Sequence, residues 1–330
     1  MLITSRTPLR ISFFGGGTDY PEYFERHPGA VVGMAIDRYI YISALKLSSF
    51  ISYKYRVSYS RLETVDSHDK ILHPVVREVL REYRIEEGLD INVLSDLPAN
   101  SGLGSSSAFT VGFINLITTL RGLRLSKIDL GRAAIRIEHD VLQERVGVQD
   151  QLHAAFGGMN RFDFVDARIR ITPVQMTAEC QTRLLQSMVL VYTGAIRNAS
   201  MVLEHQIEAT RESKIDRELS HLMALTTQAV GILEGSDPES MIDNFGTMLH
   251  DGWMTKRRLS PMISSPAIDA LYERACTAGA VGGKLCGAGS GGFLLMVVPA
   301  DNMTKFREAM QGEHLVSVGL DTQGSSILLG

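Results

Sequence analysis

Little in this 330-residue chain points to a highly charged partner or to a lipid bilayer. Acidic and basic residues nearly cancel, 37 against 33, so the sequence gives no electrostatic basis for binding nucleic acid or a membrane surface. Apolar runs such as Phe293–Val298 are far too short to span a bilayer, and the first residues lack the apolar segment of a signal peptide. We therefore expect no nucleic-acid partner and no membrane partner.

Cysteine is scarce as well, with only Cys180, Cys276 and Cys286. Their number is odd and their spacing does not match metal ligands, which is typical of proteins from the reducing cytosol. We interpret all three as small buried apolar residues. With 45% apolar residues the chain can form two domains or one large one, and we predict a cytoplasmic globular enzyme.

Pro98–Ala108, with the sequence Pro-Ala-Asn-Ser-Gly-Leu-Gly-Ser-Ser-Ser-Ala, is a turn between a predicted strand at 91–94 and a predicted helix at 109–120. Exposed N–H groups and the positive end of the helix dipole favour an anion, and glycine lets the backbone approach it closely. The serine hydroxyls can ligate a cation that accompanies a phosphate. The turn thus predicts a nucleoside triphosphate with magnesium. A serine-rich N-cap gives a similar pattern, however, and no Walker-type Gly-Lys-Ser or Gly-Lys-Thr follows.

Arg10–Tyr20 contains three consecutive glycines between an arginine and an aspartate, Asp19. The glycines leave room for a ligand, the guanidinium of Arg10 can neutralise a phosphate, and the Asp19 carboxylate can accept hydrogen bonds from sugar hydroxyls. The alternative is a plain glycine turn with a surface aspartate.

Glu138–Gln151 carries two further candidate carboxylates. Glu138 lies beside the apolar stripe formed by Ile137 and Val141, where a partly buried carboxylate suits magnesium. Asp150 follows Gly147 on a predicted loop, a frequent position for functional carboxylates. Solvated surface charges are the alternative for both.

Gly282–Gly292 holds six glycines in eleven residues and leads directly into a predicted strand at 293–298. Such a density of glycine beside a buried strand indicates a close approach of the backbone to another group. We infer a binding role, because the flanking residues are typical of a core rather than of a flexible loop.

The order of the predicted elements indicates two domains. The first half mixes helices with strands at 31–47, 52–59 and 163–171, and the alternating pattern of 52–59 predicts a half-buried antiparallel strand. Beyond about residue 183, a strand at 188–192 precedes long amphipathic helices at 199–234, 238–251 and 266–278. We predict domains at 1–183 and 184–330 that pack closely, with an active site in the cleft between them.

Four of these segments resemble, in order and spacing, the small-molecule kinases grouped as galactokinase, homoserine kinase, mevalonate kinase and phosphomevalonate kinase, the GHMP kinases. Pro98–Ala108 is similar to the phosphate-binding signature of that family, Pro-x-x-x-Gly-Leu-Gly-Ser-Ser-Ala. Arg10–Tyr20 resembles its N-terminal substrate motif, and Lys284–Gly292 resembles its C-terminal glycine motif. Gly147–Gln151 is similar to the galactokinase loop that holds the catalytic aspartate.

The resemblance implies a two-domain α+β fold. Its N-terminal domain would be an α/β domain like domain 2 of ribosomal protein S5, and its C-terminal domain would be ferredoxin-like. It implies ATP and Mg²⁺ as cofactors and a small sugar phosphate as the acceptor, with Asp150 and Arg10 as catalytic residues and Ser106 and Glu138 as magnesium ligands. The residues implied to bind the phosphates of ATP are Pro98, Ser101, Gly102, Leu103, Gly104, Ser105, Ser106 and Ser107. Those implied to bind the substrate are Gly15, Gly16, Gly17, Thr18, Asp19, Tyr20, Gly287, Gly289, Ser290 and Gly291.

One difference from the galactokinase motif narrows the choice of sugar substrate. Galactokinases carry a Glu-His pair where this chain has Gly16 and Gly17, and that glutamate contacts the far end of the hexose. Removing a carboxylate opens space and removes repulsion toward a negative group. The sequence Phe-Phe-Gly-Gly-Gly-Thr-Asp-Tyr resembles the branch that contains D-glycero-D-manno-heptose 7-phosphate kinases, so we expect phosphorylation of the anomeric hydroxyl of a heptose 7-phosphate. By residue type, Arg197, Lys256 and Arg257 are candidates for binding the distal phosphate.

Three other functions are alternatives to a heptose 7-phosphate kinase. An anomeric kinase could act on an unphosphorylated sugar such as fucose or galactose. A galactokinase-like sugar sensor would bind ATP and sugar without catalysis, but it would not need Asp150. The related decarboxylase acts on a mevalonate derivative, which does not fit the sugar-like motif Thr18-Asp19-Tyr20.

Overall fold

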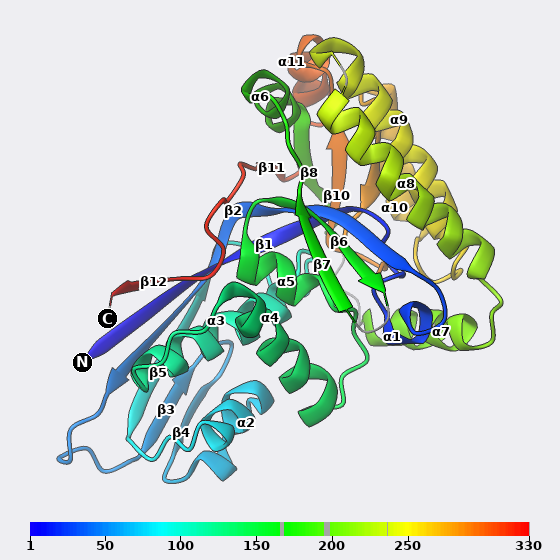
Figure 1. Ribbon diagram of the computed structural model, residues 1–330. Coiled ribbons are helices and arrows are strands. Elements are labelled where there is room, and N and C mark those ends of the chain that lie inside the picture. Colours follow the sequence, from blue (N-terminus) through cyan, green and yellow to red (C-terminus); the bar gives the residue numbers. More distant parts are fainter. Residues whose placement is uncertain (166–167, 195–198, 236, 330) are drawn as a thin grey trace.

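The computed structural model describes residues 1–165, 168–194, 199–235 and 237–329, and its chain forms two β-sheets with helices packed on them (Figure 1). The larger sheet has eight strands: β1 (Leu2–Phe14), β2 (Gly29–Lys46), β3 (Tyr55–Ser58), β4 (Leu62–Val65), β5 (Leu89–Ser95), β6 (Met159–Val165), β7 (Arg168–Pro173) and β12 (Ser326–Leu329). Its order is β12-β1-β2-β5-β3-β4, and β6 pairs with both β2 and β7. Strands β1 and β2 are long enough to form the spine of the sheet.

Helices of the first half cover one face of this sheet (Figure 1). They are α2 (Pro74–Glu82), α3 (Ser105–Leu120), α4 (Lys127–Arg136) and α5 (Gln149–Phe156), accompanied by a 3-10 turn η1 (His68–Lys70) and a π-helical turn η2 (Ile137–Val141). The short helix α1 (Pro21–Phe24) lies apart from them, beside α7 (Ala199–Arg211). Helix α3 is apolar on nearly all sides, and Val111, Phe113 and Ile114 are fully buried, as its sequence predicts. Ser126 caps α4 by accepting a hydrogen bond from the N–H of Asp129.

The smaller sheet consists of β8 (Met188–Tyr192), β9 (Gly282–Leu285), β10 (Phe293–Val297) and β11 (Leu315–Ser317), in the order β11-β8-β10-β9. Helices α6 (Ala178–Ser187), α7 (Ala199–Arg211), α8 (Asp216–Gly235), α9 (Pro238–Arg257), α10 (Pro266–Thr277) and α11 (Ala300–Ala309) accompany it. In the described part of the chain, no helix combines the length and the apolar character needed to cross a bilayer.

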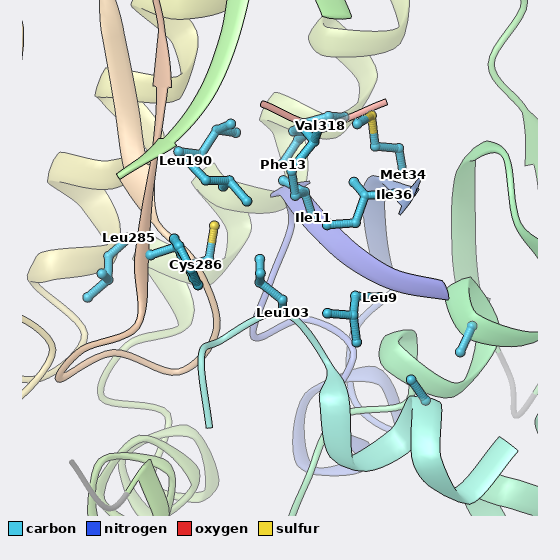
Figure 2. Packing of buried hydrophobic residues seen from close by; sticks show 14 of the residues in the cluster. Leu9, Ile11, Phe13, Met34, Ile36, Leu103, Leu190, Leu285, Cys286 and Val318 are labelled. Carbon is cyan, nitrogen blue, oxygen red and sulfur yellow. The ribbon is translucent and has the colours of Figure 1, made fainter. Parts of the chain in front are cut away.

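The two sheets share one apolar core. Phe13 and Phe14 at the end of β1 each contact the ring of Phe245 in α9, with ring centroids 5.2 and 5.5 Å apart. Figure 2 shows Leu9, Ile11 and Phe13 of β1 gathered with Leu190, Leu285 and Cys286 of the second half. This continuous packing fixes the second half against the glycine-rich end of β1.

The structure corrects part of the expected strand pattern. Residues 52–59 form only the short strand β3, which runs antiparallel to β4 but parallel to β5. The predicted strand at 31–47 belongs to one long strand, β2, and residues 166–167 within the predicted strand region 163–171 lie outside the described residues. Strand β12 pairs with β1, so the end of the chain returns to the first sheet. The sequence did not indicate this return, and the division after residue 183 stays a prediction.

Candidate functional site

All four sequence segments contribute to one cavity of about 740 Å³ between the two halves of the chain. The first segment supplies Arg10, Gly15, Gly16, Gly17, Asp19 and Tyr20, the second Gly102, Gly104, Ser105 and Ser106, the third Gly147, Gln149 and Asp150, and the fourth Lys284, Gly287, Gly289 and Gly291. Residues far apart in the sequence therefore meet at one place. Of the residues predicted to bind a ligand, Pro98, Ser101, Leu103, Ser107, Thr18, Ser290 and Glu138 do not line this cavity.

The phosphate-loop candidate ends at Gly104, which is the N-cap of α3 with a left-handed φ of 74°. Gly102 also has a positive φ, 79°, and a Cβ on it would lie 2.5 Å from the carbonyl oxygen of Cys286. A Cβ on Gly287 would likewise lie 2.5 Å from the Cα of Gly102. The two glycine loops thus pack backbone against backbone beside the free amides of α3, a helix start suited to phosphate.

Arg10 and Asp150 form a forked ion pair in this cavity. The Nε and Nη2 of Arg10 donate to the two carboxylate oxygens of Asp150 at 2.8 and 2.7 Å, and Nη1 donates to the carbonyl oxygen of Gly102 at 2.6 Å. The Arg10 side chain is 7% exposed and the Asp150 side chain 25%. Arg10 therefore links the N-terminal turn of α5, which carries Asp150, to the phosphate loop.

Asp19 is buried and bonded within the protein. Its Oδ1 accepts the N–H of Gly17 at 2.9 Å, and its Oδ2 accepts Nε2 of Gln149 at 2.9 Å. Burial raises the pKa of the Asp19 carboxyl, the nearby charge of Asp150 adds to this rise, and the two hydrogen bonds oppose it. A Cβ on Gly147 would overlap Oδ2 of Asp19, so this glycine is what allows the carboxylate to lie there. The sequence analysis gave Gln149 no role, although it stands directly before Asp150.

The three glycines after Phe14 have different surroundings. Gly15 and Gly17 have φ values of 82° and 102°, and a Cβ would collide with the carbonyl oxygen of Ala30 at the first and lie 2.7 Å from Nε2 of Gln206 at the second. At Gly16 the nearest atoms to a Cβ would be Oγ of Ser12 at 3.7 Å and Nε2 of Gln149 at 3.8 Å, both ordinary contacts. Gly16 is therefore the one position of the triplet where a side chain fits.

The two residues that follow the glycines have separate surroundings. Thr18 is fully buried and its hydroxyl bonds with the carbonyl oxygens of Gly15 and Ala30, which holds the turn. Tyr20 lines the cavity, and burial raises the pKa of its hydroxyl well above the usual value.

Only one of the two carboxylate oxygens of Glu138 has hydrogen-bond partners among the described residues. Glu138 is 1% exposed on the π-helical turn η2, and its Oε2 accepts hydrogen bonds from Oγ of Ser107, at 2.9 Å, and from Nε2 of Gln151. Its Oε1 is buried without a partner among the described residues. Burial raises the pKa of this carboxyl to about 7. An unpartnered buried carboxylate oxygen next to a phosphate loop fits a magnesium ion, since Mg²⁺ binds one or two carboxylates together with phosphate oxygens.

The serine nearest to Glu138 is Ser107, whereas Ser106 is exposed and lines the cavity. No cluster of three or more His, Cys, Asp or Glu side chains suited to a metal ion occurs within the described ranges. A magnesium ion at Glu138 would therefore need further ligands from outside the protein, such as phosphate oxygens of a nucleotide. The assignment of Ser106 and Glu138 as magnesium ligands stays a prediction.

The C-terminal glycine loop is held in place by Ser290. Its N–H donates to the carbonyl oxygen of Ile263 at 2.9 Å and its Oγ donates to that of Met262 at 2.8 Å. Ser290 is 8% exposed and has a φ of 67°. These bonds anchor the loop, while Gly287, Gly289 and Gly291 lie against the cavity.

Lys256 and Lys284 both reach the cavity. Only Lys256 was expected from its residue type to bind a ligand. Nζ of Lys284 donates to the carbonyl oxygens of Ser12 and Phe13 at 2.8 and 2.7 Å, and Nζ of Lys256 donates to that of Gly287. Burial lowers the pKa of Lys284 to about 7 and that of Lys256 to about 8. A lysine at the start of a glycine-dense segment was the available signal for Lys284.

The other two candidate cations are Arg257 and Arg197. Arg257 pairs with Asp269 at 2.7 Å and is not part of the cavity wall, and Arg197 lies outside the described residues. Among the described residues, Lys256 is thus the candidate for the distal phosphate that lines the cavity.

Two family models match the chain: GHMP kinases N terminal domain, at residues 70–158, and GHMP kinases C terminal, at residues 238–316. A D-glycero-alpha-D-manno-heptose 7-phosphate kinase of Campylobacter jejuni is 27% identical, over 94% of this chain and 94% of its own.

Solved structures are similar over nearly the whole chain. A D-glycero-D-manno-heptose 1-phosphate kinase from Bacteroides thetaiotaomicron has a TM-score of 0.75 at 23% identity, covering 99% of both chains. A galactokinase of Lactococcus lactis complexed with galactose has a TM-score of 0.74 at 18% identity, covering 98% of this chain and 95% of its own. The predicted two-domain fold is confirmed.

Proposed function

The chain belongs to the GHMP kinase family, and we infer from this that it is an ATP-dependent carbohydrate kinase. We propose that it transfers the γ-phosphoryl group of ATP to the anomeric hydroxyl of D-glycero-D-manno-heptose 7-phosphate, which gives the 1,7-bisphosphate and ADP. The heptose 7-phosphate kinase of Campylobacter jejuni supports this choice of substrate, because it is similar to 94% of this chain at 27% identity. A cytoplasmic location fits the proposal, since ATP is available there.

In this mechanism the protein mainly positions the reactants and neutralises charge, as phosphoryl transfer requires. The amides at the start of α3 would hold the triphosphate. Both carboxylate oxygens of Asp150 already accept bonds from Arg10, and their remaining lone pairs can accept the anomeric O–H. Asp150 would thereby orient the hydroxyl oxygen toward phosphorus, while Arg10 offsets the negative charge that moves during transfer.

Glu138 is the residue best suited to hold magnesium in this proposal, with Ser106 or Ser107 as the adjoining hydroxyl. When bound, the ion would neutralise phosphate charge and fix the orientation of the triphosphate. The carboxylate of Glu138 must lose its proton first, because its pKa is raised to about 7.

The single observation that carries the choice of a phosphorylated sugar is the open space at Gly16. A side chain fits there without backbone strain, yet the chain has none, and the space belongs to the cavity wall. A carboxylate at this position would repel a substrate that carries a distal phosphate. An unphosphorylated hexose would instead gain a hydrogen-bonding partner from it. The absence of a side chain therefore favours a longer, anionic sugar.

Gly16→Glu tests this choice directly. We expect kcat/KM for heptose 7-phosphate to fall by at least about tenfold, since a like charge at close range in the cavity costs about 1.4 kcal/mol or more. Values for unphosphorylated galactose or mannose should change much less. Gly231→Glu is a matched control, because Gly231 is exposed on α8 with open space around it. An equal loss for both kinds of sugar would contradict the proposed substrate.

A further inference from the structure

Lys256 and Lys284 bring two ammonium groups to the same cavity from the second half of the chain. Lys284 starts from β9 and crosses to the carbonyl oxygens of Ser12 and Phe13, directly before the three glycines. Lys256 extends from α9 to the carbonyl oxygen of Gly287 in the C-terminal glycine loop. Lys284 therefore contacts the substrate motif, Lys256 contacts a glycine loop, and both line the cavity.

Neither ammonium takes part in an ion pair with a carboxylate of the described residues. Four acidic residues line the cavity, namely Asp19, Glu144, Asp150 and Glu204, and no hydrogen bond or ion pair joins any of them to either lysine. Asp150 is engaged by Arg10, and Asp19 is engaged by Gly17 and Gln149. Two cations so placed have only carbonyl oxygens as direct partners, and the Asp19 carboxylate acts on them only from a distance, whereas buried charges are normally paired directly.

Each ammonium also keeps a donor for a ligand. A lysine has three N–H donors, and Lys284 uses two of them on backbone carbonyl oxygens. Lys256 uses one on Gly287, with a second, longer contact of 3.5 Å to the carbonyl oxygen of Leu285. At least one N–H of each lysine is thus free of a strong bond within the protein.

We propose that Lys256 and Lys284 together form a phosphate site in the cavity, on the side of the C-terminal glycine loop. A phosphate dianion would receive one N–H from each lysine and would balance both positive charges. This inference rests on the proposed function for the source of the phosphate, which is either the distal phosphate of the sugar or the γ-phosphoryl group of ATP. Burial lowers the pKa of both lysines, and a phosphate bound between them would raise both pKa values again by stabilising the charged forms.

Lys256→Met and Lys284→Met test the site, with Lys305→Met, an exposed lysine on α11, as the matched control. Dissociation constants for heptose 7-phosphate, unphosphorylated heptose, ATP and ADP would be measured by calorimetry without turnover. The four ligands form two pairs that differ by one phosphate, heptose 7-phosphate with heptose and ATP with ADP. We expect the affinity for the ligand with the extra phosphate to fall by at least about tenfold in one pair only. A loss for heptose 7-phosphate but not heptose identifies the sugar phosphate, and a loss for ATP but not ADP identifies the γ-phosphate.

Unchanged constants, or equal losses for all four ligands, would overturn the proposal. Lys284→Arg separates charge from packing, because it keeps the cation, and phosphate-dependent binding should largely return. Lys256→Met provides an independent variant if the domain contact of Lys284 proves necessary for folding.

Inorganic phosphate distinguishes a failure of this site from a failure of the proposed function. If the wild-type protein saturated with ADP binds inorganic phosphate and the two methionine variants do not, the site stands even if heptose 7-phosphate is not a substrate. If heptose 7-phosphate is a good substrate and both variants retain wild-type constants, the site is wrong while the function stands.

Discussion

At the scale of single residues, the candidate site depends on polar groups that the protein leaves incompletely satisfied. Glu138 has one buried carboxylate oxygen without a partner in the described part of the chain, and its pKa is raised to about 7. Such a group costs stability when it is ionised and unpartnered, and the magnesium ion of the proposed function would supply the missing partner.

Binding of Mg²⁺ with ADP should consequently depend on pH. Only ionised Glu138 can ligate the metal, so the affinity for MgADP should fall about tenfold between pH 8 and pH 6 as this carboxyl gains its proton. Glu138→Gln removes the titrating carboxyl, so any change of MgADP affinity with pH that remains in this variant comes from the nucleotide. Calorimetry of both proteins over this range checks the prediction. Identical slopes for the two proteins would contradict it.

Glu138 also affects the stability of the folded protein, but here the protonated form is the favourable one. Its folded pKa lies above the value of 4.5 that is usual for glutamate, so its contribution to stability without metal is complete below about pH 4.5 and is lost as pH rises through about 7. Added Mg²⁺ and nucleotide should restore stability in this range.

Sequence patterns predicted several site residues, but they could not predict side-chain pairing. Arg10 and Asp150 were singled out separately, and only the fold shows that they form a forked ion pair. Ser106 was expected to hold the metal among the four serines of the turn, whereas the hydroxyl that contacts Glu138 is that of Ser107, because helical rotation decides which side chain turns inward. The sequence did not indicate Lys284 as a site residue, because its partners are carbonyl oxygens more than 270 positions away in the sequence.

At the scale of elements, the contact between the two glycine loops joins the halves of the site. Gly102 and Gly287 approach each other so closely that neither can carry a Cβ without displacing the other loop. Gly102→Ala should therefore lower the free energy of unfolding by about 3 kcal/mol and reduce turnover strongly, through backbone strain and overlap together.

Gly122→Ala separates these two causes. Gly122 has a similar φ, 71°, but nothing lies within 4 Å of a Cβ there, so its alanine variant should lose only about 1 kcal/mol and keep its activity. Urea unfolding and steady-state rates of both variants measure the difference. Equal effects of the two substitutions would show that the loops do not depend on each other.

Strongly periodic elements were predictable from sequence, and their pairing was less so. The strand at 188–192 and the buried helix after the serine-rich turn occur where the apolar pattern places them. The direction of β3 relative to β5 is set by the path of the chain through α2, which alternation along one strand does not encode.

At the scale of the whole molecule, the end of the chain connects the second half to the helix that carries Asp150. Asp321 is buried, and its Oδ1 accepts the N–H groups of Gln323 and Gly324 at 3.0 and 2.7 Å. The N–H of Ser325 then donates to the carbonyl oxygen of Ala154 in α5 at 2.8 Å. The returning segment thus supports the far end of α5, and β12 continues from it into the first sheet.

Removing this support should loosen α5 and reduce catalysis at a distance. We expect Asp321→Ala to cost about 2 kcal/mol of stability, because two N–H groups lose their acceptor, and to lower kcat more than it changes KM. Tyr39→Phe is the milder comparison, since it removes only the hydrogen bond from the Tyr39 hydroxyl to Oδ2 of Asp321. Denaturant unfolding and rate measurements on both variants check this. An Asp321→Ala protein with the wild-type kcat would rule out a role in positioning Asp150.

The most direct test of the central claim is the kcat/KM of the wild-type protein for a panel of sugars with ATP and Mg²⁺, with the product identified by phosphorus NMR. We predict that D-glycero-D-manno-heptose 7-phosphate is the best acceptor and that the new phosphate is on its anomeric oxygen. A higher kcat/KM for galactose, mannose or fucose, or a new phosphate on another hydroxyl, would contradict this account.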